Sequence, residues 1–432
     1  GVLKLKDQMF EVENVELINF GSRTMKRDEF NDAQTEKRQA AAKHFDACME
    51  QVQEIVRSVC LDVTNLVANA EESDQQGDGF MAGFSNSGKF KSMVEAKKEE
   101  TDRRRMHRRA KQEKSMLPSF IRLADYIMVE SMVSLTLKAE NDFLAVLLED
   151  QNRKSGFETT VQFNEEGTTF SPTCADIKAM IAGMTDGIIT TANSVQRVLF
   201  YRPLREFAPT LGREGPVVQA IIRTSGDFKR IQSLIDQRVE SSFQKANSIV
   251  AALAEIRPIY EFNRDFDIDA FKAQLMGAGP NLNNVVRSQM DQIDQWLAPS
   301  GLDRVVRGHQ TVGILTVEGR HLKEMLKGPT EENLDLIKGL LREIARTRCR
   351  DQLNNYREKI EKLAAAPENL KAFAGHVSDL NKLTGEERDL EKEHLVVESL
   401  YNTLNTYNVM IPADDAVQLD DMRSEMDSYH DR

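Results

Sequence analysis

The stretch that decides the fold runs from Leu380 to Leu404 and reads LNKLTGEERDLEKEHLVVESLYNTL. Written in heptads, its d positions are apolar in every repeat: Leu383, Leu390, Val397 and Leu404. Its a positions are mixed: Leu380, Glu387, His394 and Tyr401. A seven-residue apolar spacing with half of its partner positions polar is typical of a long amphipathic helix whose seam is only partly dry. Such a helix must pack against other helices, so the stretch predicts coiled-coil-like bundling.

The same helical spacing returns along most of the 432 residues. Helices are expected at about 28–69, 118–148, 177–200, 228–256, 268–276, 282–297, 314–327, 331–363 and 367–407. Charged residues make up 29% of the chain and aromatic residues 6%, a composition that favours long helices over sheets. The chain is also longer than one ordinary hydrophobic core supports. We therefore expect an all-α fold, an elongated series of helical bundles.

Two short stretches instead favour β-structure. Residues 2–20 combine Val, Leu, Ile and Phe in partial alternation, which predicts a strand or hairpin. Residues 157–171 alternate clearly around a polar turn that contains Gly167, which predicts a β-hairpin. Pro172 ends that hairpin, and Asp176 lies near the start of the next helix.

Glycine and proline clusters divide the chain. The segments are 1–88 (strand element, helix and Gly-rich loop), 89–210 (helical bundle with the hairpin), 211–366 (second bundle) and 367–432 (long helix and neck). Bending is expected at three breaks: residues 202–216, 277–280 and 299–301. We expect Pro118 to restart a helix and Gly328–Pro329 to separate two helices.

The four cysteines, Cys48, Cys60, Cys174 and Cys349, show no CxxC spacing and are expected to be free thiols. No apolar run approaches about 18 residues, so no membrane span is expected. The first residue is not Met and no signal-peptide core follows it, which suggests an internal segment of a longer protein.

A basic region between Ala96 and Lys114 contains the candidate docking residues Arg104, Arg105, Arg108 and Arg109. It has two interpretations: a solvated helix face, or a docking face for an acidic partner such as a tubulin tail or a subunit. Phe80 and Phe84 lie in the preceding Gly-rich loop. They either pack the loop against a neighbouring element or are available to bind a partner chain. The net charge of −12 and the lack of interleaved aromatic residues argue against nucleic acid.

Residues Gly83–Lys89 fit the phosphate-binding pattern GxxxxGK, but the next residue is Phe90, which cannot bind Mg²⁺ as a Ser or Thr would. No buried strand precedes the loop, so a flexible loop is the favoured interpretation. His309, His321 and Glu318 are the nearest approach to a metal set, without any zinc-site spacing. We therefore expect no catalytic residue, cofactor or metal in this chain.

Two regions carry a resemblance to a known family. The first comprises FKSMVEAK (90–97), FIRLADY (120–126), the 157–163 strand and TFSP (169–172). The second comprises LYNTL (400–404), YNVMIP (407–412), Val417, Leu419 and Met422. Together they resemble the N-terminal tail of dynein heavy chains, axonemal ones in particular, close to where the tail meets the linker. One departure is Met426, which stands where the family commonly has Trp.

This resemblance implies a force-transmitting tail that holds the motor to the doublet microtubule in the cytoplasm of a cilium or flagellum. Its implied partners are dynein intermediate and light chains, another heavy chain and axonemal docking proteins, and not nucleic acid or membrane. ATP hydrolysis in this family belongs to a ring of AAA+ modules further along the chain.

Two other classes of function stay open. One is a helical cytoskeletal or vesicle-tethering adaptor unrelated to dynein, against which the 407–412 pattern argues. The other is a nucleotide hydrolase that uses Gly83–Lys89; unchanged nucleotide binding in Lys89→Ala, or none at all, would remove it.

Overall fold

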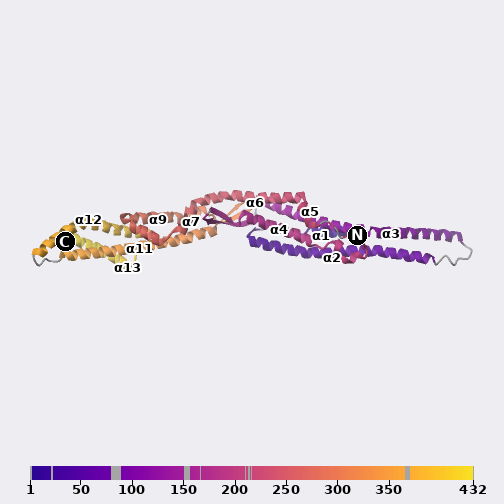
Figure 1. Ribbon diagram of the computed structural model, residues 1–432, viewed down its shortest axis with the longest axis horizontal. Coiled ribbons are helices and arrows are strands. Elements are labelled where there is room, and N and C mark those ends of the chain that lie inside the picture. Colours follow the sequence, from indigo (N-terminus) through magenta and orange to yellow (C-terminus); the bar gives the residue numbers. More distant parts are fainter. Residues whose placement is uncertain are drawn as a thin grey trace. The chain divides into compact units, whose positions relative to one another are not determined.

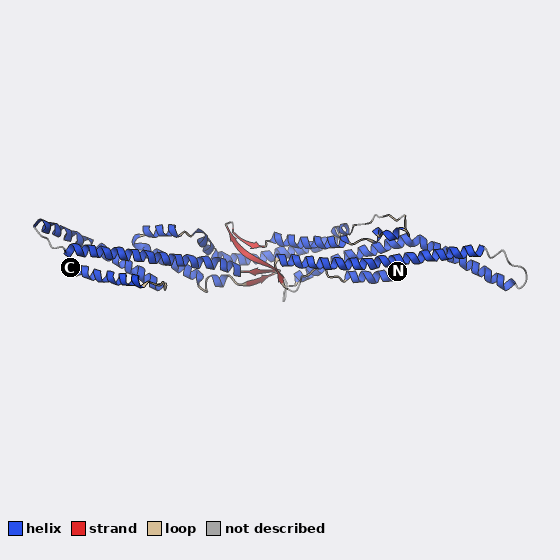
Figure 2. Ribbon diagram, turned by 90° about the horizontal axis from the view of Figure 1, so that it is seen from below, coloured by secondary structure: helices blue, strands red, loops and turns tan. Residues whose placement is uncertain are grey.

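The computed structural model describes residues 2–20, 23–78, 89–149, 156–165, 167–209, 211, 212, 215, 217–364 and 370–431. Helices account for most of these residues, and five short strands form one small sheet (Figures 1 and 2). The expected class, all-α helical bundles with a small β-element, is confirmed.

The chain divides into two compact units. The first comprises Gly1–Thr159, Phe170–Asn247 and Thr311–Val317. The second comprises Thr160–Thr169, Ser248–Gln310 and Glu318–Arg432. The four segments inferred from the sequence stay predictions.

Two long helices dominate the first unit, α2 (Arg27–Asp78) and α3 (Lys89–Leu148), and they pack against each other (Figure 1). Three shorter helices pack on this pair: α1 (Val2–Glu13), α4 (Cys174–Ser194) and α5 (Val218–Thr224). The unit also contains two 3-10 turns, η2 (Val198–Phe200) and η3 (Arg202–Arg205), and most of α6 (Gly226–Leu253).

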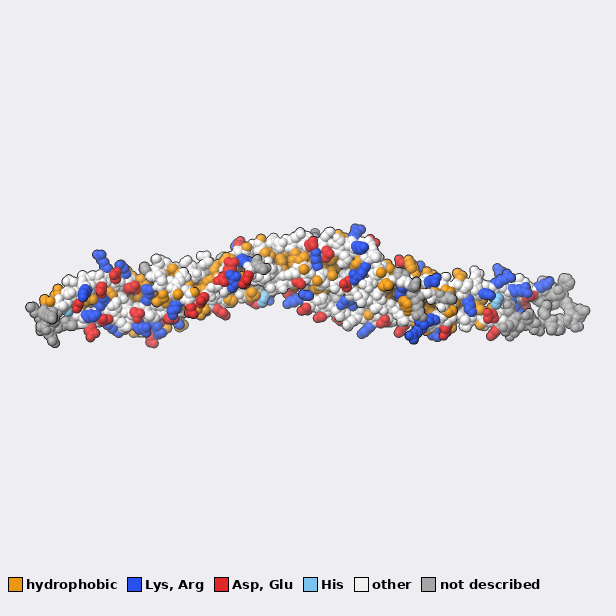
Figure 3. All heavy atoms as spheres, viewed as in Figure 1, with side chains coloured by type: hydrophobic (Ala, Val, Ile, Leu, Met, Phe, Trp, Pro, Cys, Tyr) orange, Lys and Arg blue, Asp and Glu red, His pale blue; other side chains and the backbone are white. Residues whose placement is uncertain are grey.

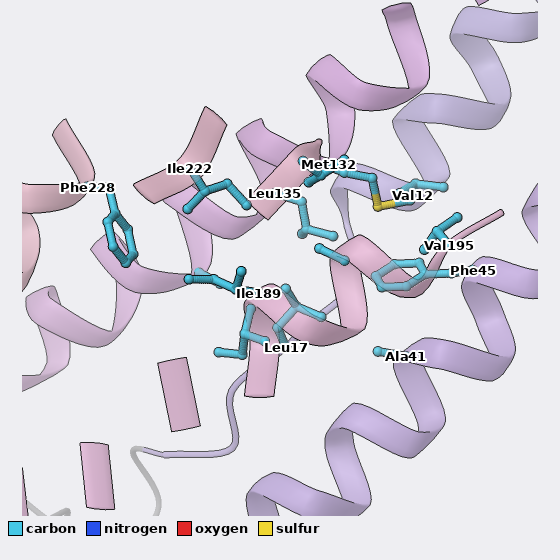
Figure 4. Packing of buried hydrophobic residues seen from close by; sticks show 14 of the residues in the cluster. Val12, Leu17, Ala41, Phe45, Met132, Leu135, Ile189, Val195, Ile222 and Phe228 are labelled. Carbon is cyan, nitrogen blue, oxygen red and sulfur yellow. The ribbon is translucent and has the colours of Figure 1, made fainter. Parts of the chain in front are cut away.

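The core of this unit lies where these helices meet (Figure 4). Val12 from α1, Phe45 from α2, Met132 from α3 and Ile189 from α4 are each at most 1% exposed. Their burial removes apolar surface from water, which is the main stabilising contribution to such a bundle.

The strand expected within residues 2–20 is wrong, because residues 2–13 form α1. Its buried side chains, Leu5, Met9 and Val12, are four and three residues apart, which is the spacing of one helix face. The apolar residues appeared to alternate because residues 2–20 include both this helix face and the non-helical segment after it, in which Leu17 is buried.

The expected helix at 28–69 is confirmed as part of α2, which continues into the predicted loop as far as Asp78. The expected restart at Pro118 is wrong, because α3 runs through it without a break. Proline removes the hydrogen bond to the carbonyl four residues earlier. That carbonyl belongs to the exposed residue Lys114, where water can replace the lost donor.

The predicted hairpin at 157–171 is confirmed as strands β2 (Gly156–Asn164) and β3 (Gly167–Ser171). Thr173 and Asp176 then start α4 with a capping box. The Thr173 hydroxyl accepts from the Asp176 N–H at 3.2 Å, and the Asp176 carboxylate accepts from the Thr173 N–H at 2.9 Å. Both donors belong to the helix end and have no partner within the helix, so the cap defines where α4 begins.

Strands β1 (Thr24–Met25), β4 (His309–Val312) and β5 (Leu315–Glu318) complete the sheet, in the order β1-β2-β5-β4. The helix expected at 314–327 is therefore wrong over its first residues. Gly313 makes the β4–β5 turn with φ of +60°, and a Cβ there would lie 2.4 Å from the Ser242 hydroxyl oxygen. A turn that only glycine fits favours the hairpin over the helix.

The second unit is built mainly from α9 (Leu282–Leu297), α11 (Arg320–Ala364), α12 (Leu370–Thr406) and α13 (Ala413–His430). Shorter elements are η4 (Ala254–Ile256), α7 (Arg257–Asp265), α8 (Ile268–Gly277), η5 (Gly279–Asn281) and α10 (Leu302–Val305). The helices expected at 268–276 and 282–297 are confirmed, and the one expected at 367–407 is confirmed from Leu370, where the described residues resume. The break expected at Gly328–Pro329 is wrong, because α11 includes both residues.

Pro329 removes the hydrogen bond to the Met325 carbonyl, and Met325 is 41% exposed, so water can replace the lost donor and the helix continues. Beside the proline, Asn263 of α7 donates its side-chain amide to the Leu326 carbonyl at 3.0 Å, and the buried Thr330 hydroxyl donates to the Asn263 side-chain oxygen at 3.0 Å.

The heptad seam of α12 is buried over only part of its length. Leu390, Val397 and Leu404 are at most 6% exposed, but Leu380 is 40% exposed. The expectation of a seam that is only partly buried is confirmed, and its buried part lies toward the C-terminal end of the helix.

Candidate partner-docking surface

The four predicted docking arginines, Arg104, Arg105, Arg108 and Arg109, lie on α3 and are all exposed. Phe80, Phe84 and most of the GxxxxGK stretch lie outside the described residues; Lys89 is the first residue of α3. Figure 3 shows Lys and Arg side chains mixed with apolar ones in the part of the surface where Figure 1 labels α3.

Some of these arginines are paired along their own helix. Arg104 lies 2.6 Å from Glu100, and Arg109 lies 3.1 Å from Glu113, both as i,i+4 pairs. Exposed pairs of this kind contribute at most about 0.5 kcal/mol each, so a partner can displace them at little cost. No carboxylate of the described residues forms a salt bridge with Arg105 or Arg108, and basic residues outnumber acidic ones between Lys97 and Lys114. The region is therefore a net positive surface.

Apolar side chains on the same helix are also exposed. Met106 is 69% exposed, Met116 58%, Leu123 44% and Tyr126 61%. The apolar spacing over residues 118–148 predicted a helix but not that Leu123 and Tyr126 face outward. The available signal was their spacing, because Arg109, Met116 and Leu123 are seven residues apart and so lie on one face.

The opposite face of α3 is the core-facing one. Ile121, Met128 and Met132 are all 0% exposed. Asp125 is also buried there, and the Arg197 guanidinium donates to its carboxylate, with the Nε–Oδ1 distance at 3.2 Å. The Leu199 N–H donates to the same carboxylate at 3.3 Å. This face is fully used by the fold, so only the outer face is open to another molecule.

One buried carboxyl has an unusual environment. Glu140 of α3 is 0% exposed; it accepts from the Gln232 amide at 2.9 Å through Oε2, and Oε1 has no hydrogen-bond partner. Burial raises the pKa of this carboxyl to about 7, although hydrogen bonds with Thr185 and Gln232 act in the opposite direction. An apolar bundle core that surrounds one carboxyl explains this shift.

A cavity of about 340 Å³ in the first unit is lined by Leu17, Phe20, Leu135, Phe143 and their neighbours. Lys138 and Asp142 are its charged lining residues on α3, and the Lys138 ammonium donates to the Glu13 carbonyl at 3.4 Å. No nucleophile with an adjacent base lines this cavity, so it provides no catalytic arrangement.

In the described chain, one group of side chains could hold a metal ion: Glu387 and Glu391 of α12 with His430 of α13. His430 Nδ1 lies 3.4 Å from Glu387, and Nε2 lies 3.9 Å from Glu391. Each ring nitrogen faces a different carboxylate, and none of the three side chains is buried, so the group is a surface cluster. Glu318 accepts from the backbone N–H groups of Arg320 and His321, so it caps α11.

The expectation of free cysteines is confirmed: Cys48, Cys60 and Cys349 are buried, and Cys174 is half-buried. Burial raises the pKa of the Cys60 and Cys349 thiols to about 11, so they are poor nucleophiles at neutral pH.

None of the described helices is long and apolar enough to span a bilayer. No protein-family model matches the sequence. The chain is similar to "Dynein axonemal heavy chain 6" of Homo sapiens, with 20% identity over an alignment of 344 residues that covers 69% of this chain. It spans 8% of the length of that relative. This distant similarity agrees with the resemblance of residues 90–172 and 400–422 to axonemal dynein heavy chains.

Proposed function

We propose that this chain is a force-bearing tail segment of an axonemal dynein heavy chain. The observation that carries the proposal is the similarity to an axonemal dynein heavy chain over 344 residues. That match covers most of this chain, so it is not confined to one short motif.

The fold supports a mechanical role. α2, α3 and α11 contain 52, 60 and 45 residues, and at about 1.5 Å per residue a 60-residue helix is about 90 Å long. A helix stretches only if its backbone hydrogen bonds break, so long helices that pack against each other suit the transmission of tension.

Polar contacts between helices also oppose sliding. In the second unit the Thr403 hydroxyl of α12 donates to the Asn283 side-chain oxygen of α9 at 2.7 Å, and the Asn283 side-chain amide donates to the Ser399 backbone carbonyl at 3.3 Å. The Gln352 amide of α11 donates to the Leu390 carbonyl of α12 at 3.1 Å. A shift of one helix along another would leave these groups unpaired, which costs about 1–3 kcal/mol for each buried group.

On this proposal the chain has no catalytic role of its own, and ATP hydrolysis belongs to AAA+ modules in other parts of the heavy chain. Its partners are dynein intermediate and light chains, another heavy chain or docking proteins of the doublet microtubule. It acts in the axoneme of a cilium or flagellum.

The test is to tag the endogenous gene in ciliated cells. We expect the tagged protein along the axoneme, and we expect mass spectrometry to find these 432 residues in a much longer polypeptide with AAA+ modules. A tagged protein that is absent from axonemes, or that lacks motor modules, would remove the proposal in favour of a helical adaptor.

A further inference from the structure

The exposed face of α3 has a heptad pattern of its own. Positions alternate by four and three residues along it: Arg105, Arg109, Gln112, Met116, Ser119, Leu123 and Tyr126. All seven side chains are exposed, and we refer to them as the α3 seam. This spacing keeps side chains on one stripe of a helix and is the spacing by which a second helix packs.

The fold of the chain does not explain the apolar part of the seam. Met116, Leu123 and Tyr126 are 44–61% exposed, while the core face of the same helix segment is fully buried at Ile121 and Met128. Single exposed apolar residues need no explanation, but apolar residues that follow one another along a heptad stripe indicate an interaction surface.

The seam is also polarised along its length. Its N-terminal end carries Arg105 and Arg109, and its C-terminal end carries Leu123 and Tyr126. Arg105 has no salt bridge with the described residues, and Arg109 has only its exposed i,i+4 pair with Glu113. Acidic side chains opposite the arginines would complement this charge, and apolar side chains opposite the other end would bury its surface.

This pattern discriminates between possible occupants. A β-strand has a period of two and cannot match alternating steps of three and four. A second copy of α3 in parallel would place arginine against arginine, which is unfavourable. An antiparallel copy would place Arg105 and Arg109 against the apolar end, where the charges would lack carboxylate partners.

We propose that the α3 seam binds one amphipathic α-helix of another chain, acidic at one end of its apolar stripe and apolar at the other. The inference rests on the proposed function, because it specifies the chemistry of a subunit that the tail would bind. The arginines select the partner and its direction, and the apolar end supplies most of the affinity.

The probe is a pair of helix-stapled four-heptad peptides whose a and d positions are acidic in two heptads and leucine in the other two. The pair differs only in which half is acidic, so it covers both helix directions. A second pair has lysine in place of the acids. With the full 432-residue chain, fluorescence anisotropy should show one acidic peptide binding at least ~10-fold tighter than its lysine counterpart.

Matched variants locate the binding. Met116→Ser with Leu123→Ser should weaken binding ~10-fold or more, whereas Leu336→Ser, 50% exposed but on α11, should leave it unchanged. Arg105→Glu with Arg109→Glu should reverse the preference toward the lysine peptide. Lys111→Glu with Lys114→Glu makes the same change in charge off the seam and should not reverse it. Circular dichroism checks that every variant stays folded.

Three results would overturn the proposal: no binding by either acidic peptide, equal binding of acidic and lysine peptides, or equal losses in seam and control variants. A dimer of the chain that Leu123→Ser abolishes in sedimentation would assign the seam to a second copy instead. If the tagged protein is absent from axonemes while the peptide still binds, the proposed function fails and the seam stands. If the protein is axonemal and the peptide does not bind, the seam alone fails.

Discussion

Individual buried polar residues set the conditions under which the first unit is stable. Glu140 lies in an apolar core with one oxygen unpaired, and its hydrogen-bonding neighbours, Thr185 and Gln232, are both neutral. Asp125 is equally buried but is matched by a guanidinium and a backbone N–H. Both carboxyl groups lie on α3. Burial favours the neutral form of Glu140, whereas Asp125 forms an ion pair with Arg197.

Glu140 should make the stability of the chain depend on pH. Its pKa of about 7 in the folded chain lies above its ordinary value of 4.5, so the folded state holds a proton that the unfolded state releases. The free energy of unfolding should therefore fall as pH rises from about 4.5 to about 7 and then level off, by roughly 3 kcal/mol at most.

Glu140→Gln should remove this dependence and raise the free energy of unfolding at pH 8 by roughly 1–3 kcal/mol, with little change at pH 5. Urea unfolding at both pH values measures it. The exposed Glu36→Gln is the control and should change neither value. A loss of stability at pH 8 in Glu140→Gln would contradict the account.

Asp125→Ala should destabilise the first unit by about 3–5 kcal/mol, because Arg197 would keep a buried charge without its carboxylate. The matched control is Glu255→Ala, which removes an exposed partner of Arg304 and should cost less than about 1 kcal/mol. Chemical denaturation of both variants gives the comparison, and similar losses in the two would show that burial does not determine the cost.

At the scale of elements, helix α12 shows that one heptad pattern can have two structural outcomes. Its later d positions pack against α9 and α11, but its first a position, Leu380, is 40% exposed. Equal spacing therefore does not mean equal burial, because burial requires a neighbouring helix at that level.

Leu404→Ala should destabilise the second unit by about 2–5 kcal/mol, because Leu404 is 0% exposed and its loss leaves a cavity. Leu380→Ala, the same change on the same helix, should cost less than about 1 kcal/mol. Thermal or urea unfolding of the two variants measures the difference. Equal losses would mean that a partner covers Leu380 in solution.

At the scale of the whole molecule, the described chain combines two cores with an acidic overall charge and a local basic face. Burial shifts the pKa of several core groups of different kinds, among them Glu140, Cys60 and Tyr356. The Cys48 Sγ lies 3.4 Å from the His44 Nε2, but burial raises the pKa of this thiol, which makes it a poorer nucleophile.

We expect the isolated chain to bind no nucleotide, because Phe90 follows the GxxxxGK stretch where a Mg²⁺-binding hydroxyl is needed. Titration with a fluorescent ATP analogue and Mg²⁺ should give no saturable signal, and Lys89→Ala should behave as the parent chain. Saturable binding that Lys89→Ala abolishes would restore the nucleotide-hydrolase hypothesis.

The sequence by itself determined the helical class, the 157–171 hairpin, the free thiols and most helix positions. These follow from local periodicity, turn residues and the absence of metal or disulfide spacing, which need no knowledge of neighbours. Only the tertiary structure decided that residues 2–13 are helical, that α3 and α11 continue through their prolines, and that residues 309–318 form a hairpin. It also decided that Glu140 is buried while Leu123 and Leu380 are exposed. The physical reason is that the burial of a side chain and the tolerance of a proline depend on which surfaces meet in space. A repeat of apolar residues at steps of three and four is the same in the sequence whether that face of the helix packs on a core, contacts solvent or binds another chain.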